Sequence, residues 1–290
     1  MDTQELGFIV SPSKVQVFTY LYKEPRENPN GKAEKDRHNR VINNRRTYEN
    51  LHSPTDRRRV LCGLCVRSLL SLEYVMIRIS VTSKLDGIRS WSLQALDTCP
   101  GSKNADGTLV DACSGCYATT GNYRYPNVKA PRLENREDWQ RLEWVDDMVK
   151  ALGNDRFFRW FDSGDMYSIG LAQKILEVMQ RTPWVQHWLP TRMHKFPKFR
   201  AVLREMMALN NVSVRFSSDS IRGEFTKGLH GSVIVPTPEH VPAGVSLCEA
   251  YSRGGKCDGC RACWDRSVAV IAYPAHGKKM AKVINIKVAA

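Results

Sequence analysis

The chain has 290 residues, of which 42% are hydrophobic, and this is enough for a sizeable buried core. No run of about eighteen uncharged apolar residues is present and the first residues do not resemble a signal peptide, so we expect a cytoplasmic protein with no membrane partner. Forty-three Lys and Arg against thirty Asp and Glu give a net charge of +13, which favours a nucleic-acid partner over a merely soluble basic surface.

The first 75 residues differ in composition from the rest. Residues 23–67 are polar and Arg-rich with almost no periodic apolar pattern, which is typical of a flexible basic arm. Such an arm would grip DNA or RNA; the alternative is an extension without a role, with synthesis beginning at Met76. Cys62 and Cys65 have metal-ligand spacing, but without visible partners they are more simply interpreted as two free thiols.

From Met76 onward the apolar pattern becomes regular. It predicts strands at 76–81, 156–161, 185–191, 212–217 and 232–235, and helices at 139–152, 169–180 and 196–209. This alternation indicates parallel strands joined by crossover helices. Polar residues follow successive strands, as they do at the catalytic mouth of a barrel. We therefore predict an α/β fold, in which a complete or incomplete TIM-like (β/α) barrel at 76–247 precedes a Cys-rich metal-binding segment and final strands at 248–290.

We do not expect the nine cysteines to form disulfides, because the cytosol keeps thiols reduced, and their spacing indicates metal ligands instead. The sharpest group has the pattern C-x8-C-x2-C-x2-C, with glycines that permit tight turns: Cys248, Cys257, Cys260 and Cys263. Four thiolates suit zinc or a [4Fe-4S] cluster equally. His276 is a lower-ranked candidate to replace one thiolate.

A second cysteine group comprises Cys99, Cys113 and Cys116. Three thiolates with an open fourth position resemble the cluster of radical S-adenosylmethionine enzymes, although the C-x13-C-x2-C spacing is wider than is usual there. Structural zinc completed by a remote ligand is the equally weighted alternative.

Carboxylates after the strands are the candidate catalytic groups. Asp162 and Asp165 flank Ser163 and Gly164 directly after an aromatic strand, and Asp219 follows a later one. Paired carboxylates can perform displacement at a sugar carbon, whereas the plainer interpretation is helix capping or turn closure. We expect Arg192 and Lys195 to contact phosphate, or else to form a solvated basic edge. Four aromatic residues are candidates for base stacking, although most should be core: Trp160, Tyr167, Trp184 and Trp188.

Five segments, namely TSKLDGIRSWSL, TCPGS, CSGCYA, RFFRWFDSGDMYS and CDGCRACW, resemble a phage and plasmid family known mainly as a numbered gene product. The resemblance spans about residues 82–277 and implies viral origin and a barrel-like, cysteine-ligated enzyme.

A weaker resemblance is to the guanine transglycosylases, barrel enzymes with a D-S-G-G-F loop and a three-cysteine, one-histidine zinc site. Here Asp162, Ser163 and Gly164 match the loop, but Asp165 replaces its second Gly and the cysteine spacing differs. This resemblance implies a DNA-guanine transglycosylase of the phage DpdA type, which would insert a 7-deazaguanine into DNA to evade restriction in the host cytoplasm. Asp162 would then hold the base, Asp219 or Asp165 would attack the sugar, and zinc would be structural.

Two other functions stay open. One is an iron-sulfur enzyme of the radical S-adenosylmethionine type acting on nucleic acid through Cys99, Cys113 and Cys116. The other is a zinc-stabilised DNA-binding regulator. The sequence gives no indication of the oligomeric state.

Overall fold

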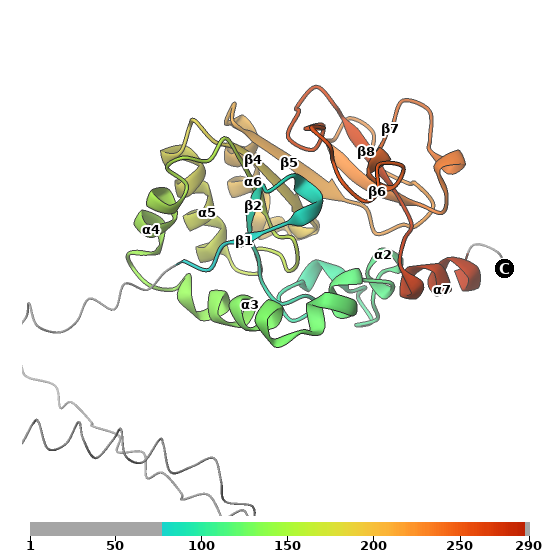
Figure 1. Cartoon of the computed structure of the whole chain (residues 1–290), viewed down its shortest axis with the longest axis horizontal. Helices are drawn as coiled ribbons and strands as arrows, with labels where there is room; N and C mark the ends of the chain where they lie inside the picture. The colour runs from blue at the N-terminus through green and yellow to red at the C-terminus, as the bar shows by residue number, and fades with distance from the viewer. Residues whose placement is uncertain (1–76, 288–290) are drawn as a thin grey trace, which may run out of the picture. The chain divides into compact units, whose positions relative to one another are not determined.

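The computed structural model describes residues 77–287 and shows a mixed α/β fold built on one eight-stranded sheet. The spatial order of the strands is β1-β2-β3-β4-β5-β6-β8-β7 (Figure 1). Their bounds are β1 Ser80–Val81, β2 Arg89–Trp91, β3 Phe157–Trp160, β4 Gln186–Thr191, β5 Val212–Ser217, β6 Gly231–Val235, β7 Ser246–Leu247 and β8 Val270–Pro274. Only β1 pairs antiparallel with its neighbour, so the sheet is mostly parallel, as expected.

Strands β2 to β6 follow one another in space as they do along the chain, which is the order found in (β/α) barrels. The sheet is nevertheless open, because β1 and β7 occupy its two edges and do not pair with each other. A closed TIM barrel is therefore not formed. The edge strands are two residues long each, which is too short for a ladder that would join the edges.

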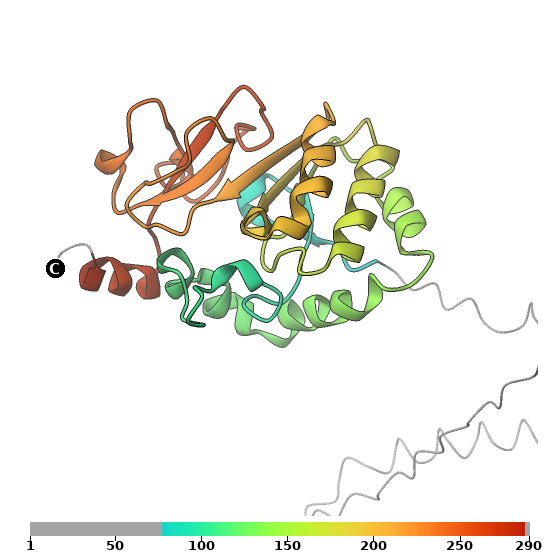
Figure 2. The same ribbon diagram turned by 180° about the vertical axis from the view of Figure 1, so that it is seen from behind.

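Three helices cover one face of the sheet: α4 (Trp144–Ala151), α5 (Ile169–Arg181) and α6 (Arg200–Ala208) (Figure 2). Alternate side chains of the strands point into this layer, and Phe158 and Leu189 are fully buried there. Helix α5 is held at its start by Ser168, whose side chain accepts a hydrogen bond from the Leu171 amide. No helix within residues 77–287 has the length and apolar character needed to cross a membrane.

The opposite face of the sheet is covered by the Cys-rich segment and by the turn after β1. Trp264 packs against Trp188 of β4, and its indole nitrogen donates to the Phe158 carbonyl at 2.9 Å. Arg215 of β5 is fully buried and donates to carbonyls of the same segment. The Cys-rich segment, predicted to bind metal, therefore packs on the second face of the sheet.

A row of helices lies along the carboxyl ends of the strands in both views: α3 (Pro126–Asp138), α2 (Asp111–Ser114) and α7 (Lys278–Lys287) (Figures 1 and 2). The apolar pattern predicted neither α3 nor α7. The predicted helix at 196–209 begins later, at Arg200, because Pro197 starts a separate 3-10 turn. The basic arm, Cys62 and Cys65 lie outside the described residues.

Candidate functional site: a cysteine-lined cavity

A cavity of about 640 Å³ opens between the second face of the sheet and the loops at the carboxyl ends of the strands. Its volume lies in the range of small-molecule sites. Six of the seven described cysteines line it: Cys99, Cys113, Cys116, Cys248, Cys257 and Cys263. Both cysteine groups predicted from the sequence therefore face the same cavity, and Cys260 is exposed outside it.

The first cysteine group lies on residues 92–125, between β2 and α3, which we call the cysteine-bearing segment to distinguish it from the Cys-rich segment at 248–290. Cys99 precedes a 3-10 turn, Cys113 lies on α2, and Cys116 follows one turn later, where its amide donates to the Cys113 carbonyl at 3.1 Å. Burial, together with the nearby Asp165 carboxylate, raises the pKa of the Cys99 thiol to about 12. Burial likewise raises the pKa values of Cys113 and Cys116. Such thiols are neutral unless a cation compensates the charge of the thiolate.

Ser163 and Gly164 bind the start of this segment to the end of β3. The Leu93 amide donates to the Ser163 carbonyl at 3.0 Å, and the Ser163 hydroxyl donates to the Leu93 carbonyl at 2.7 Å. Gly164 has a φ of 82°, and a Cβ there would lie 2.6 Å from the Leu93 Cβ. Only glycine permits this approach, so the Gly predicted as a substrate contact serves close packing of two backbones.

Asp165 forms hydrogen bonds both to the cysteine-bearing segment and to the end of β4. Its amide donates to the Thr98 carbonyl at 3.1 Å, one residue before Cys99. Its carboxylate accepts hydrogen bonds from the Thr191 hydroxyl at 2.8 Å and from the amides of Met166 and Arg192 at 2.8 and 2.9 Å. Burial raises the pKa of Asp165 to about 6, against the lowering effect of these donors.

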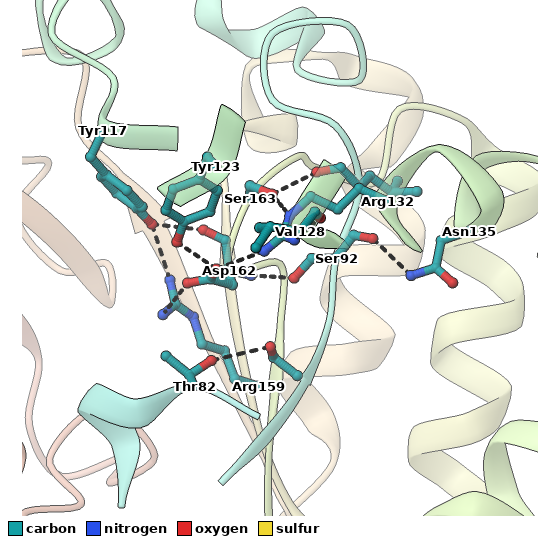
Figure 3. Close-up of polar contacts among 12 residues, drawn as sticks. Thr82, Ser92, Tyr117, Tyr123, Val128, Arg132, Asn135, Arg159, Asp162 and Ser163 are labelled. Carbon is teal, nitrogen blue, oxygen red and sulfur yellow. Dashed lines mark hydrogen bonds and ion pairs between the residues drawn. The ribbon is translucent and has the colours of Figure 1, made fainter. Parts of the chain in front are cut away.

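Asp162 lies at the centre of a buried ionic network (Figure 3). One oxygen accepts from Arg159 at 3.2 Å, and the other accepts from Arg132 of α3 at 3.1 Å and from the Tyr123 hydroxyl at 2.6 Å. The Tyr117 hydroxyl donates to the Asp162 carbonyl at 2.7 Å. Because Tyr117 follows Cys116 directly, this network attaches the cysteine loop to the end of β3.

Asp219 makes the third attachment, at the end of β5. Its carboxylate pairs with Arg192 at 3.2 Å and with Lys195 at 2.6 Å, and its carbonyl accepts from the Ala112 amide at 3.0 Å, next to Cys113. Lys195 also donates to the Gly101 carbonyl at 3.2 Å. Arg192 and Lys195, predicted to contact phosphate, are thus occupied by a carboxylate and by the cysteine-bearing segment.

The second cysteine group lies on the wall opposite the first segment. The amides of Cys248 and Cys257 donate to the carbonyls of Ala272 and Lys84, and the Cys263 sulfur lies 3.3 Å from the Tyr273 hydroxyl. Burial raises the pKa of Cys263 to about 11. This group is therefore fixed by the backbone pairing of β8 and by the turn after β1.

The thiols are near neighbours but are not gathered around one point. Within residues 77–287, no three Cys, His, Asp or Glu side chains converge closely enough to hold an ion in their present rotamers. The donor sets fit soft metals such as zinc or iron in chemistry and in number. His276, predicted as a possible ligand, has its ring between those of Tyr117 and Tyr251, and its Nδ1 donates to the Pro274 carbonyl at 3.3 Å.

Sequence reasoning missed the arginines and tyrosines that organise the site: Arg132, Arg159, Arg215, Tyr117 and Tyr123. A signal was present for two of them, since Arg159 interrupts an otherwise apolar strand and Arg215 lies between Val214 and Phe216 in a strand predicted to be buried. A charged residue in such a strand needs buried partners.

The four aromatic candidates for base stacking divide between the core and other roles. Trp160 is fully buried in the helix-covered core, and Tyr167 accepts a hydrogen bond from the indole of Trp139. Trp184 is 40% exposed and donates to the Leu152 carbonyl. Only Trp188 lines the cavity, where the Arg159 guanidinium lies 4.5 Å from its ring centroid.

Comparison with known proteins gives one match. A family model described as gene product 88 matches residues 79–266, which is more than half of the chain and includes both cysteine groups. Neither the curated proteins nor the solved structures contain a match to this chain.

Proposed function

The chain belongs to the gene product 88 family, and from its cavity we propose that it is an iron-sulfur enzyme of the radical S-adenosylmethionine type. Cys99, Cys113 and Cys116 would hold a [4Fe-4S] cluster. One observation carries the proposal: the polar groups at the ends of β3, β4 and β5 bind the segment that bears these three cysteines.

Three cysteine ligands leave one iron of a four-iron cluster without a protein ligand. When bound, such a cluster supplies one electron to a substrate at that iron. The cavity beside the three thiols has room for a second molecule, at the carboxyl ends of parallel strands, where active sites of (β/α) folds lie.

The local backbone supports a shared ligand for two of the thiols. Cys113 and Cys116 are three residues apart, the Cys116 amide donates to the Cys113 carbonyl, and both residues line the cavity. Cys99 faces the same space from the start of the segment, and the three thiols are close enough to raise one another's pKa.

The DNA-guanine transglycosylase hypothesis has less support from the contacts of the carboxylates. Its chemistry needs one carboxylate that is free to attack a sugar carbon. Asp162, Asp165 and Asp219 are each engaged by two or more donors that anchor loops. It stays a prediction, with 7-deazaguanine and DNA as its substrates and zinc as its structural metal. The DNA-binding regulator stays a prediction too, and no contact among residues 77–287 favours it.

The test is the metal content and spectrum of the full chain purified without oxygen. We expect brown protein that contains iron and sulfide and gives an electron paramagnetic resonance signal after reduction with dithionite. Cys99→Ala and Cys113→Ala should each remove that signal, whereas the neighbouring Ser114→Ala should keep it.

Colourless protein that contains only zinc, even after incubation with iron and sulfide, would overturn the proposal. Incorporation of labelled 7-cyano-7-deazaguanine into duplex DNA by the same protein would favour the transglycosylase instead.

A further inference from the structure

Three aromatic rings form a row at the edge of the cavity: Tyr117, His276 and Tyr251. The ring centroids of Tyr117 and His276 lie 6.1 Å apart with an interplanar angle of 26°, and those of His276 and Tyr251 lie 4.7 Å apart. All three residues line the cavity, yet Tyr117 is 41% and Tyr251 is 43% exposed. The row therefore offers apolar ring faces to a molecule that enters the cavity.

The three rings come from distant parts of the chain that the fold brings together. Tyr117 follows Cys116, Tyr251 ends the 3-10 turn after Cys248, and His276 lies between β8 and α7. The orientation of Tyr117 is fixed by its hydroxyl on the Asp162 carbonyl, and that of His276 by its Nδ1 on the Pro274 carbonyl. Rings that are held in place in this way lose little freedom when a planar ligand stacks on them.

Lysine side chains lie near the aromatic row. The Lys84 ammonium lies 5.4 Å from the ring centroid of Tyr251. Helix α7 begins two residues after His276, and residues 276–287 contain four lysines and no acidic residue. Lys278 and Lys282 are exposed, share one face of α7, and have no ion-pair partner within residues 77–287. Met280 of the same helix lines the cavity, so Lys278 and Lys282, two residues to either side of it, project from the opposite face of α7. Lys84 itself lines the cavity and has no ion-pair partner within residues 77–287, so it is the cation next to the rings.

We propose that the aromatic row and Lys84 bind a nucleotide unit, with the base on the rings and the phosphate on the Lys84 ammonium. Exposed aromatic rings next to unpaired cations are the combination that binds single-stranded nucleic acid. The proposal rests on the iron-sulfur function in one respect, because it takes the nucleotide to be the substrate of that enzyme. Binding of the nucleotide itself needs no cluster. The unit comes from a free nucleotide or from a single strand.

The test uses 2-aminopurine, a fluorescent base that is quenched when it stacks on an aromatic ring. The full-length protein is titrated into a short DNA strand that contains 2-aminopurine and, separately, into the monophosphate of the same base. We expect quenching by the wild type and about tenfold weaker binding by Tyr251→Ala and His276→Ala. Tyr251→Phe keeps the ring and should bind as the wild type does.

A charge-reversal pair tests the phosphate contact. Lys84→Glu should weaken binding and reduce its dependence on salt, because it removes the cation that displaces counterions beside the rings. Lys198→Glu, at an exposed position on the helix-covered side of the sheet, should do neither. Circular dichroism and a thermal melt establish that every variant is folded.

Quenching that is absent in the wild type, or equal in Tyr251→Ala and the wild type, overturns the proposal. Stronger binding of the strand than of the monophosphate identifies nucleic acid as the source, and equal binding identifies the free nucleotide. Iron is measured in the same samples. Protein without iron that still quenches would refute the iron-sulfur function alone, and brown protein that does not quench would refute nucleotide binding alone.

Discussion

The buried guanidinium of Arg215 donates from Nε to the Cys263 carbonyl at 2.9 Å. Its two terminal nitrogens donate to the carbonyls of Ala262, Asp265 and Val268 at 2.7 to 2.9 Å. With a longer bond of 3.4 Å to the Ala269 carbonyl, one side chain on β5 thus satisfies five backbone carbonyls of the Cys-rich segment, which has little regular secondary structure of its own. Arg215 therefore supplies the hydrogen-bond donors that a neighbouring strand would otherwise provide to these carbonyls.

Replacing Arg215 with Met should cost at least about 3 kcal/mol of unfolding free energy, because several buried carbonyls lose their donors at once. Urea unfolding followed by fluorescence measures the change. Arg204→Met removes an exposed arginine of α6 and should alter stability by less than about 0.5 kcal/mol. Equal stability of the two variants would mean that the Cys-rich segment does not depend on Arg215.

Asp162→Asn tests whether this carboxylate is an anchor or a catalytic group. The change leaves the buried Arg132 and Arg159 without their shared counterion, so we expect a loss of about 3 kcal/mol of unfolding free energy and looser attachment of the Cys116 loop. Urea unfolding and the rate of thiol labelling at Cys116 measure both effects. Asp146→Asn, which breaks an exposed pair with Arg181, should cost less than about 1 kcal/mol. A stable but inactive Asp162→Asn protein would instead favour the catalytic role.

The sequence predicted strands β3 to β6 and the helices that cover them well because apolar periodicity reports burial directly. The three- and two-residue strands β2 and β7 were missed, and the strand expected at 76–81 is reduced to Ser80–Val81. The strand expected at 212–217 matches β5 at both ends, and the helix expected at 169–180 differs from α5 by one residue. Helix α3 was missed for the same reason. The residues that it buries are Arg132 and Asn135, and an apolar pattern cannot reveal a helix whose buried face is polar.

The sequence predicted which residues lie at the candidate site better than it predicted what those residues do there. The expectation that polar residues lie at the carboxyl ends of three successive strands is consistent with the structure, since Asp162 and Asp165 follow β3, Thr191 ends β4 and Asp219 follows β5. Several of their partners, among them Tyr123 and Arg132, lie on residues 93–132, which have no periodic pattern, so the sequence offered no means of pairing them. Only the tertiary structure relates these acids to the cysteine-bearing segment.

Gly164→Ala should destabilise the protein more than a glycine substitution with the same backbone strain in open space. Both Gly164 and Gly87 have φ near 80°, but a Cβ at Gly87 meets nothing within 4 Å, whereas one at Gly164 would lie 2.6 Å from the Leu93 Cβ. We expect Gly87→Ala to cost about 1 kcal/mol from strain alone. Gly164→Ala adds the displacement of the segment before Cys99 and should cost at least about 2 kcal/mol more. Urea midpoints of the two variants give the comparison, and similar values would mean that the contact between β3 and this segment adapts freely.

His187 of β4 is a buried, neutral histidine remote from the cavity. Its Nδ1 accepts a hydrogen bond from the Trp160 indole at 3.3 Å, which leaves Nε2 to donate to the Thr182 hydroxyl at 2.9 Å. Burial lowers the pKa of His187 to about 3. The unfolded chain, in which a histidine has a pKa of about 6.5, therefore binds more protons than the folded chain between these two values.

Stability contributed by neutral His187 should be complete above pH 6.5 and should fall as the pH is lowered toward 3, by up to about 1.4 kcal/mol per pH unit. Urea unfolding of the wild type and of His187→Gln at pH 7, 6, 5 and 4 measures this slope. The difference in unfolding free energy between the two proteins should shrink by about that amount per unit below pH 6, because Gln cannot take up a proton. His240→Gln, at an exposed position, should keep the wild-type slope. A difference that stays constant with pH would show that His187 is protonated in the folded chain as readily as in the unfolded chain.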